Sequence, residues 1–165
     1  MLNEGAARRK WSGNNALKLT SLPITSSPWQ RPNFGLSVHY KFHNKTPEAS
    51  PAGTSYYASG YKPVVFDIFQ LAAHVDAGNA FCIADIGTER KGANFQAAQL
   101  IGLDFDTKGI EELIQDAFIL DRAALIYETA SSTAAAPRAR VIFVLDRSII
   151  DAATYTKFVT RLLAL

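Results

Sequence analysis

The chain has 165 residues, of which 48% are hydrophobic and 19% charged, with 17 Lys and Arg against 15 Asp and Glu. This composition is typical of one globular domain and excludes a disordered or low-complexity chain. No apolar run is long enough for a membrane span and the start has no signal-peptide hydrophobic region, so we expect no membrane partner. The single cysteine, Cys82, excludes an intramolecular disulfide and favours a reduced, intracellular protein.

Charge is distributed unevenly along the sequence. Residues 1–62 hold eight Lys and Arg against two acids, a balance of +6, whereas residues 63–165 hold nine against thirteen, a balance of −4. A basic segment ahead of an acidic domain suits a protein that contacts phosphate backbones, although a solvated basic terminus explains the charge equally well. We interpret 1–62 as a basic, loop-rich N-terminal extension and 63–165 as the patterned core.

The first half of the chain alternates between expected loops and short elements. Residues 1–34 show no sustained period and residues 44–60 are rich in Pro and Gly, so loops are expected there, with a strand at 36–42 between them. Pro63 is expected to open a helix that ends at Gly78. Its expected buried face consists of Val65, Ile68, Phe69, Ala72 and Ala73. A strand at 80–86 and a turn at 87–92 should follow.

The second half carries stronger patterns. The run 99–105 is apolar and ends in acids, which indicates a buried strand. Helical spacing then predicts one helix at 110–118, and strands are expected at 123–127 and 141–145. A last helix should start at the cap Asp151. Its expected buried residues are Tyr155, Phe158, Val159, Leu162 and Leu163. Strands mixed with helices predict an α+β domain, a mixed β-sheet with flanking helices.

The most informative feature is the pair of acids that closes the apolar strand, Asp104 and Asp106. Residues two apart in a strand point to the same face, so the two carboxylates should project together. Adjacent carboxylates repel each other unless a cation lies between them or one is protonated. Mg²⁺ or Mn²⁺ binds carboxylate and phosphate oxygens together, and two such ions support phosphoryl transfer. The alternative is a strand-end turn with solvated acids.

A second group of polar residues follows the strand at 123–127. The segment 129–137 is rich in small and hydroxyl side chains, and Arg138 and Arg140 enter the next strand two residues apart. Both guanidinium groups should lie on one face, where they could hold a triphosphate, or simply form the charged face of an edge strand. The loop pair Arg90 and Lys91 could reach phosphate or template, or be a solvated loop tip.

Four segments, taken in order, resemble phage and plasmid members of the archaeo-eukaryotic primase superfamily. They are Gly78–Phe81, Arg90–Phe95, Leu100–Asp106 and Thr129–Arg140. The similarity covers roughly residues 63–165. It implies a primase–polymerase-like catalytic core that acts on nucleoside triphosphates and single-stranded or primed DNA with Mg²⁺ or Mn²⁺. It also implies phage or plasmid replication in a bacterial, archaeal or phage-infected cytoplasm, with a helicase domain or protein as a further partner.

The resemblance implies roles for individual residues. Asp104 and Asp106 match the metal-binding acid pair of the first motif, and Ser131 matches the serine of the second. Arg138 and Arg140 match the basic pair near bound nucleotide phosphates. Two loop residues, Arg90 and Lys91, are expected to assist in nucleotide binding.

The sequence also departs from the family. Ser132 stands where related sequences often have a histidine, and Arg140 stands about where the wider superfamily has another. A third metal-binding Asp is expected after the last helix, which runs apolar to Leu165 without a stop signal, so we expect the core to be an incomplete fragment. Two other classes stay open: a degenerate, non-catalytic DNA-binding replication module, and a metal-dependent nuclease or replication initiator.

Overall fold

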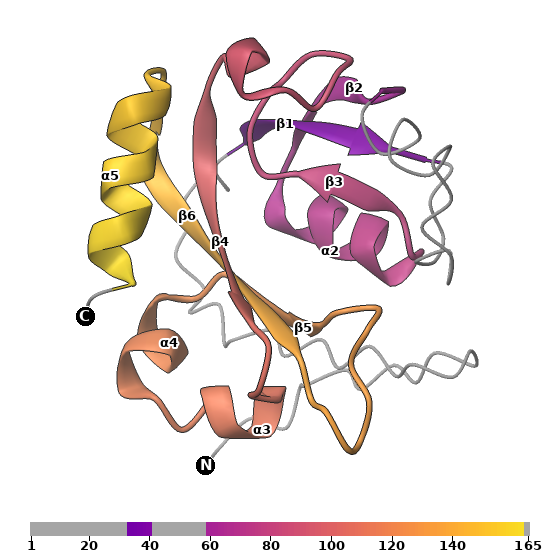
Figure 1. The fold of residues 1–165 in the computed structure, drawn as a ribbon, viewed down its shortest axis with the longest axis vertical. Helices are drawn as coiled ribbons and strands as arrows, with labels where there is room; N and C mark the ends of the chain where they lie inside the picture. Colours follow the sequence, from indigo (N-terminus) through magenta and orange to yellow (C-terminus); the bar gives the residue numbers. More distant parts are fainter. Residues whose placement is uncertain (1–32, 41–58, 164–165) are drawn as a thin grey trace. The chain divides into compact units, whose positions relative to one another are not determined.

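The computed structural model describes residues 33–40 and 59–163, which form an α+β fold of helices and small antiparallel sheets (Figure 1). One sheet has the strand order β2-β1-β3 and the other the order β4-β6-β5. The strands are β1 (Phe34–His39), β2 (Lys62–Phe66), β3 (Ala80–Cys82), β4 (Ala98–Phe105), β5 (Leu125–Glu128) and β6 (Ala139–Ile149). The helices are α2 (Ile68–Asp76), the 3-10 helix η1 (Gly92–Asn94), α3 (Ile110–Leu113), α4 (Ala117–Arg122) and α5 (Ala152–Leu162).

The described residues divide into two compact units. The β1 unit comprises the described residues of Pro32–Ile101 and Leu145–Leu165, and the β5 unit comprises Gly102–Val144. Strands β4 and β6 run through both. Within these residues, no helix has the length and hydrophobicity that crossing a membrane requires.

Strand β1 is the buried centre of its sheet. It pairs antiparallel with β2, where Phe34 lies opposite Phe66, and with β3, where Ser37 lies opposite Cys82. Its apolar side chains are almost fully buried, which explains why the strand predicted at 36–42 is confirmed over residues 36–39. The expected boundary between residues 62 and 63 falls inside β2. The expected loops at 1–32 and 44–58 lie outside the described residues.

The helix predicted from Pro63 is wrong at its start. Pro63 belongs to β2, and α2 begins only after Asp67, whose side chain accepts hydrogen bonds from the backbone N–H groups of Phe69 and Gln70. The Gln70 side chain accepts a bond from the Asp67 N–H in return, which completes a capping box. Propensity explains the error, because the β-branched pair before Phe66 favours the strand that β1 completes.

The buried face of α2 also differs from the prediction. The helix buries Leu71, His74 and Val75, whereas Val65 is 66% exposed in β2 and Phe69 is 39% exposed. The three buried residues have i, i+3, i+4 spacing, but a histidine among them disguised the pattern. The predicted end at Gly78 is confirmed, because this residue follows the C-cap with a φ of 76° that favours glycine.

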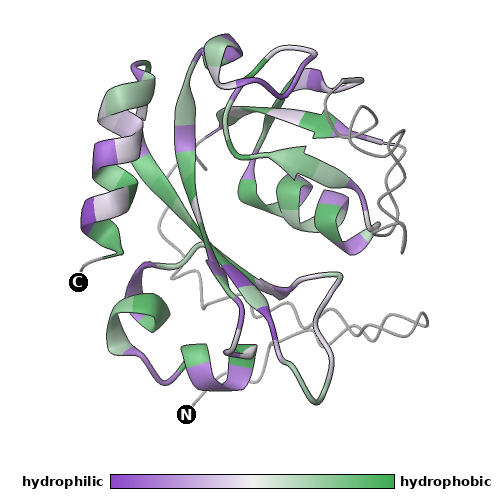
Figure 2. Cartoon of the chain, in the orientation of Figure 1, coloured by the Kyte–Doolittle hydropathy of each residue, from purple (hydrophilic) through white to green (hydrophobic). Residues whose placement is uncertain are grey.

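The predicted burial of five residues on α5 is only partly correct. Tyr155, Val159 and Leu162 are half-buried at i, i+4, i+7 spacing, whereas Phe158 is 44% and Leu163 is 64% exposed. The two exposed residues lie outside this narrow stripe, and Figure 2 shows hydrophilic and hydrophobic residues together on α5. The predicted start is confirmed, because Asp151 caps the helix by accepting a bond from Thr154 N–H.

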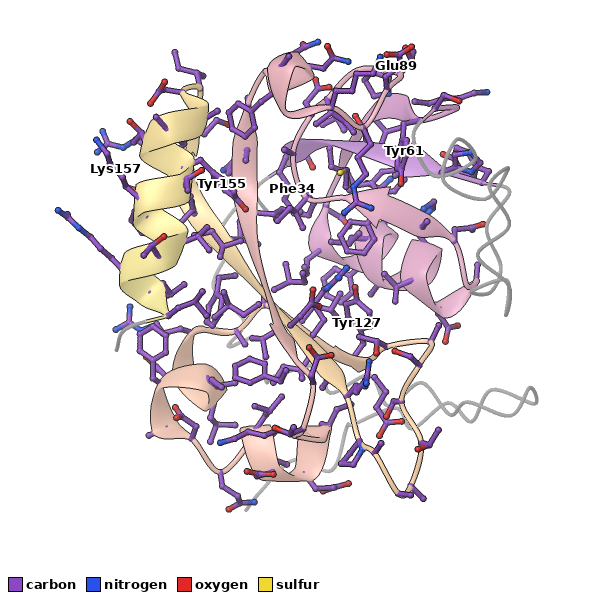
Figure 3. All side chains as sticks on the ribbon, viewed as in Figure 1. Phe34, Tyr61, Glu89, Tyr127, Tyr155 and Lys157 are labelled. Atoms are coloured by element: carbon purple, nitrogen blue, oxygen red, sulfur yellow. The ribbon has the colours of Figure 1, made fainter. Side chains whose placement is uncertain are left out.

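Tyr155 ties α5 to the rest of the β1 unit. Its hydroxyl donates a hydrogen bond of 3.2 Å to the Leu100 carbonyl, and its ring lies 5.6 Å from that of Phe95. Figure 3 shows Tyr155 pointing inward from α5 while Lys157 points away. Burial, and secondarily the nearby Cys82, raise the pKa of Tyr155 to about 12, so its hydroxyl stays a donor at neutral pH.

The single helix predicted at 110–118 is two short helices in the β5 unit. The side chain of Asp116 accepts bonds from the N–H groups of Phe118 and Ile119, so it starts α4 after α3 has ended at Leu113. Consequently Ile119 is buried, whereas Phe118, on the expected apolar face, is 46% exposed.

The strands of the β5 unit follow the sequence patterns closely. The predicted strand at 99–105 is β4, which begins one residue earlier, and the strand at 123–127 is β5, shifted to 125–128. The strand at 141–145 is the middle of the longer β6. β5 and β6 pair antiparallel, with Tyr127 opposite Arg140 and Glu128 opposite Ala139.

Candidate functional site

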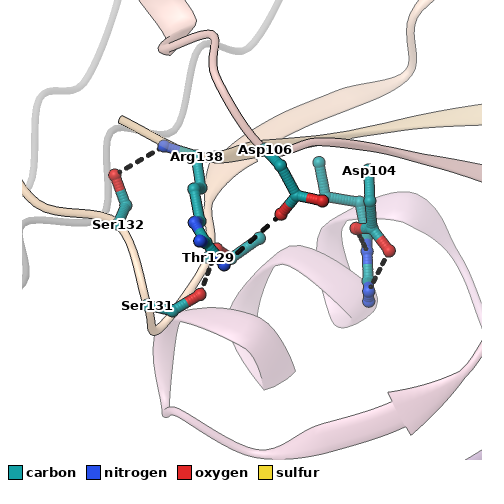
Figure 4. Close-up of polar contacts among 7 residues, drawn as sticks. Asp104, Asp106, Thr129, Ser131, Ser132 and Arg138 are labelled. Carbon is teal, nitrogen blue, oxygen red and sulfur yellow. Dashed lines mark hydrogen bonds and ion pairs between the residues drawn. The ribbon is translucent and has the colours of Figure 1, made fainter. Parts of the chain in front are cut away.

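The two predicted acids lie at the end of β4. Asp104 is in the strand and Asp106 directly follows it, and their side chains are 53% and 75% exposed. The preceding Leu103 is only 7% exposed, so the carboxylates lie where the buried core ends. The expectation that both carboxylates share one face is consistent with the structure, because Asp104 pairs with Arg140 of β6 and Asp106 pairs with Arg138, which directly precedes β6 (Figure 4).

Arg140 binds Asp104 through two nitrogen atoms of its guanidinium group. Its Nε donates to Oδ1 of Asp104 and its Nη2 donates to Oδ2 at 2.8 Å, which is a bidentate pair. Its Nη1 donates to the hydroxyl of Tyr127 at 3.3 Å. Three nitrogens of one guanidinium group are therefore engaged, and both oxygens of Asp104 are used.

Burial and ion pairing act in opposite directions on Arg140. Burial alone would lower its pKa, but the hydrogen bonds and charge of Asp104, with the Tyr127 hydroxyl, outweigh burial and raise the pKa above its ordinary value. Burial has the opposite effect on Tyr127: it raises the pKa of the phenol, whereas the charge and hydrogen bond of Arg140 lower it. Arg140 is therefore a permanent cation and Tyr127 a neutral phenol at physiological pH.

Arg138 holds Asp106 more weakly. One ion-pair contact of 3.4 Å joins Nη1 of Arg138 to Oδ1 of Asp106. The Nε of Arg138 is buried and has no hydrogen-bond partner. Its backbone N–H donates to the hydroxyl of Ser132 at 3.0 Å, so Ser132 holds the residue that directly precedes β6. Arg138 thus has a buried donor that no acceptor in the described residues satisfies.

The hydroxyl-rich loop between β5 and β6 is ordered by its own side chains. The hydroxyls of Thr129 and Ser131 lie 3.3 Å apart, and the Thr129 N–H donates to the carbonyl of Arg138 at 3.1 Å. Thr133 closes the tip through its hydroxyl, which accepts from Ala136 N–H at 3.0 Å. Ser131 is half-buried beside the Arg138–Asp106 pair (Figure 4). The loop therefore presents hydroxyls next to the charged pairs.

The loops that carry the acids and the arginines also approach each other. A Cβ atom placed on Gly109 would lie 3.3 Å from Cβ of Pro137. Gly109 caps α3, three residues after Asp106, and Pro137 precedes Arg138. A larger residue at Gly109 would press on the loop that positions Arg138.

The residues present fit a divalent cation in their chemistry, with one condition. Mg²⁺ is commonly bound by one or two carboxylates together with substrate phosphates and water, and Asp104 and Asp106 supply two hard oxygen ligands. Across residues 33–40 and 59–163, no three His, Cys, Asp or Glu side chains form a metal-binding group. The condition is that Arg140 releases the oxygens of Asp104, since both accept its hydrogen bonds.

The remaining predicted residues, Arg90 and Lys91, belong to the β1 unit. They lie in the loop before η1, where the Lys91 ammonium pairs with the Glu89 carboxylate at 2.6 Å. Their role in nucleotide binding stays a prediction. Tyr127 is the residue that the sequence interpretation missed. Only the strand register, which places it opposite Arg140, reveals its contact with the site.

Comparisons with known proteins found no matching protein-family model, curated protein or solved structure.

Proposed function

We propose that the β5 unit carries the nucleotidyl-transfer site of a primase–polymerase-like protein of phage or plasmid replication. The observation that supports this proposal is the pairing of two acids at the end of β4 with two arginines at the start of β6, beside a hydroxyl-rich loop. Carboxylates for a divalent cation and guanidinium groups for phosphates are the two side-chain types that phosphoryl transfer requires. The resemblance of residues 63–165 to the archaeo-eukaryotic primase superfamily points to the same chemistry.

Each residue has a defined task in this proposal. Asp104 and Asp106 hold Mg²⁺ or Mn²⁺, and Arg138 and Arg140 bind the phosphates of a nucleoside triphosphate. Ser131 orients the same phosphates through its hydroxyl. A divalent cation held by Asp104 and Asp106 would supply positive charge that offsets the charge of the phosphates and of the departing pyrophosphate. The side chains of the chain position these groups for attack by the 3′-hydroxyl of a DNA end on the α-phosphorus.

The finer fold assignment is part of the same proposal. The α+β architecture is compatible with part of a primase–polymerase core, in which a third carboxylate would complete the metal site. Single-stranded or primed DNA is the proposed partner, and a helicase domain or protein is a further one. The basic residues of 1–32 and 41–58, proposed to contact DNA, lie outside the described part of the chain.

A primer-extension assay with Mn²⁺, labelled primed DNA and each nucleoside triphosphate tests the proposal. Asp104→Asn and Asp106→Asn should each lower incorporation at least about 100-fold, the scale expected when a charge-stabilising group is removed. Asp121→Asn is the matched control, because it removes one charge from an exposed ion pair with Arg122 in α4 of the same unit. Unchanged incorporation in either site variant would refute the proposal. Cleavage without triphosphates would instead indicate the nuclease alternative.

A second candidate function is a non-catalytic DNA-binding module. The observation that favours it is that each acid is already neutralised by an arginine. In that case the four charges form cross-strand ion pairs that stabilise the sheet. Mn²⁺ binding separates the candidates, because a non-catalytic module should bind DNA without Mn²⁺ binding that depends on Asp104 and Asp106.

A further inference from the structure

The acids and the arginines of the site block each other. Both oxygens of Asp104 accept hydrogen bonds from Arg140, so this carboxylate cannot bind a cation in the same way at the same time. The same bonds keep Nε and Nη2 of Arg140 from a phosphate. The site as it stands is therefore charge-paired internally, and any ligand has to compete with this pairing.

A ligand that takes only Asp104 or only Arg140 from their ion pair binds unfavourably. A cation that took Asp104 by itself would leave the guanidinium group of Arg140, whose side chain is only 31% exposed, without its counter-charge and with a hydrogen bond to the Tyr127 hydroxyl. A phosphate that took Arg140 by itself would leave Asp104 without its counter-charge. Separating a partly buried ion pair costs more than the pair contributes, because a desolvated charge stays behind.

We propose that Asp104 and Arg140 exchange partners together, so that the site accepts a divalent cation and a polyphosphate as one complex. This inference rests on the proposed function and adds the order of events to it. Arg140 moves from the carboxylate to phosphate oxygens while Asp104 moves to the cation, and every charge stays compensated. The ligand class is a metal–polyphosphate complex. A free cation or a free polyphosphate is a poor ligand.

The second pair is the weaker counterpart of the first. Arg138 and Asp106 share one contact of 3.4 Å, and their side chains are 38% and 75% exposed. A polyphosphate therefore displaces this single, more exposed contact more easily than the two hydrogen bonds between Arg140 and Asp104, and the Arg140 pair determines the cost of binding.

Binding of inorganic tripolyphosphate in metal-free buffer containing EDTA tests the competition. Calorimetric titration should give Asp104→Asn an affinity about five- to tenfold above the unaltered chain, since the variant frees Arg140 from a charged hydrogen-bonded pair. The control Asp121→Asn should change affinity less than about twofold, as expected for a distant screened charge. In an Arg140→Gln background, the Asp104→Asn change should no longer raise the affinity for tripolyphosphate, because Arg140 is absent and cannot be released from its ion pair.

The reciprocal arm uses Mn²⁺ alone, detected by electron paramagnetic resonance of the free ion. Arg140→Gln should bind Mn²⁺ about five- to tenfold more tightly than the unaltered chain, because Asp104 no longer has a competing cation. Arg122→Gln, which removes a positive charge from the α4 ion pair, should change Mn²⁺ affinity much less. Arg140→Lys serves as a second variant should the glutamine variant fail to fold, and it should give an intermediate gain.

The outcomes separate the two proposals. Gains in both arms that vanish in the double variant support the partner exchange. A different result overturns the exchange and leaves the proposed function standing. In that result, tripolyphosphate and Mn²⁺ binding depend on Arg140 and Asp104, but neither single variant gains affinity. If neither ligand binding depends on these residues, both the exchange and the proposed function are wrong.

Discussion

Each of the two units has an aspartate near the end of an apolar strand, and the two aspartates have different partners. In the β1 unit, Oδ1 of Asp85 accepts a hydrogen bond from the Gly87 N–H at 3.0 Å and lies 3.4 Å from the Ser37 hydroxyl. In the β5 unit, Asp104 faces the guanidinium group of Arg140. The first acid is bound by neutral groups of a turn, whereas the second is bound by a cation on the neighbouring strand.

The contrast shows that the donors around an acid, rather than its place in the sequence, determine what it can bind. Asp85 belongs to a network in which the buried Ser37 hydroxyl accepts from the Ile86 N–H at 3.0 Å and lies 3.2 Å from the Gly87 carbonyl. Exchanging any member would leave a buried polar group without a partner. The pairs of the β5 unit instead contain charges that a charged ligand can replace.

The largest expected effect comes from replacing Asp104 and Asp85 in turn, which tests whether the two aspartates have different roles. Asp104→Ala should lower nucleotide incorporation at least about 100-fold, and it should also lower stability by about 1–3 kcal/mol because the partly buried Arg140 loses its counter-charge. Asp85→Ala should lower stability as well, but it should retain incorporation per folded molecule. Primer extension and urea unfolding of both variants give the comparison. A loss of incorporation from Asp85→Ala in fully folded protein would contradict it.

The next effect concerns the buried network. Ser37→Ala should destabilise the protein by about 1–3 kcal/mol, because the Ile86 N–H is left buried without its acceptor. Chemical denaturation measures this loss. The affinity for tripolyphosphate should stay within about twofold of the unaltered chain, since no charge changes. Ser131→Ala is the matched control for removal of a hydroxyl, and it should affect affinity more than stability.

A smaller effect tests how much the Tyr127 hydroxyl contributes to the site. Tyr127→Phe removes the hydroxyl that accepts from Nη1 of Arg140, and we expect a loss of stability of about 0.5–1.5 kcal/mol. The bidentate contact with Asp104 should persist, so incorporation should fall only several-fold. Thermal unfolding and primer extension measure the two effects. A loss of incorporation as large as that of Asp104→Ala would assign Tyr127 a direct role in the reaction.

The smallest effect is a pH dependence confined to the β1 unit. Burial lowers the pKa of His74, although its hydrogen bond to the Ala80 carbonyl acts in the opposite direction. The unfolded chain therefore binds a proton more readily than the folded chain, and this part of the stability is complete above the ordinary histidine pKa of about 6.5 and is lost as the pH falls below it. His74→Gln should flatten urea-unfolding stability between pH values of about 5.5 and 7.5. An unchanged slope would assign the dependence to other groups.

The sequence was informative where one short pattern determined one element. The apolar run before Asp104 and Asp106 predicted β4 within one residue, and Asp151 predicted the start of α5. It failed where a polar residue decided the outcome. Asp116 divides the expected helix at 110–118 into two, and Asp67 delays the start of α2. Such caps act through local hydrogen bonds that hydrophobic spacing does not contain.

The candidate site was predictable in its members and not in its pairing. Spacing of two residues indicated that Asp104 and Asp106 would share a face, and the same holds for Arg138 and Arg140. Which acid meets which arginine depends on how β4 lies against β6, and no local pattern encodes that alignment. The contact of Tyr127 with Arg140 was hidden for the same reason, because it follows from long-range strand pairing.

The ladder of ion pairs also has a consequence for folding. Asp104 meets Arg140 and Asp106 meets Arg138, so the partners run in opposite order along the two strands, as antiparallel neighbours require. A slip of one residue would turn one set of charges toward the face that buries Leu103 and Val141. The same four side chains thereby penalise misaligned pairing. A variant without any of them should fold to a less uniquely aligned sheet even where its hydrophobic core is unchanged.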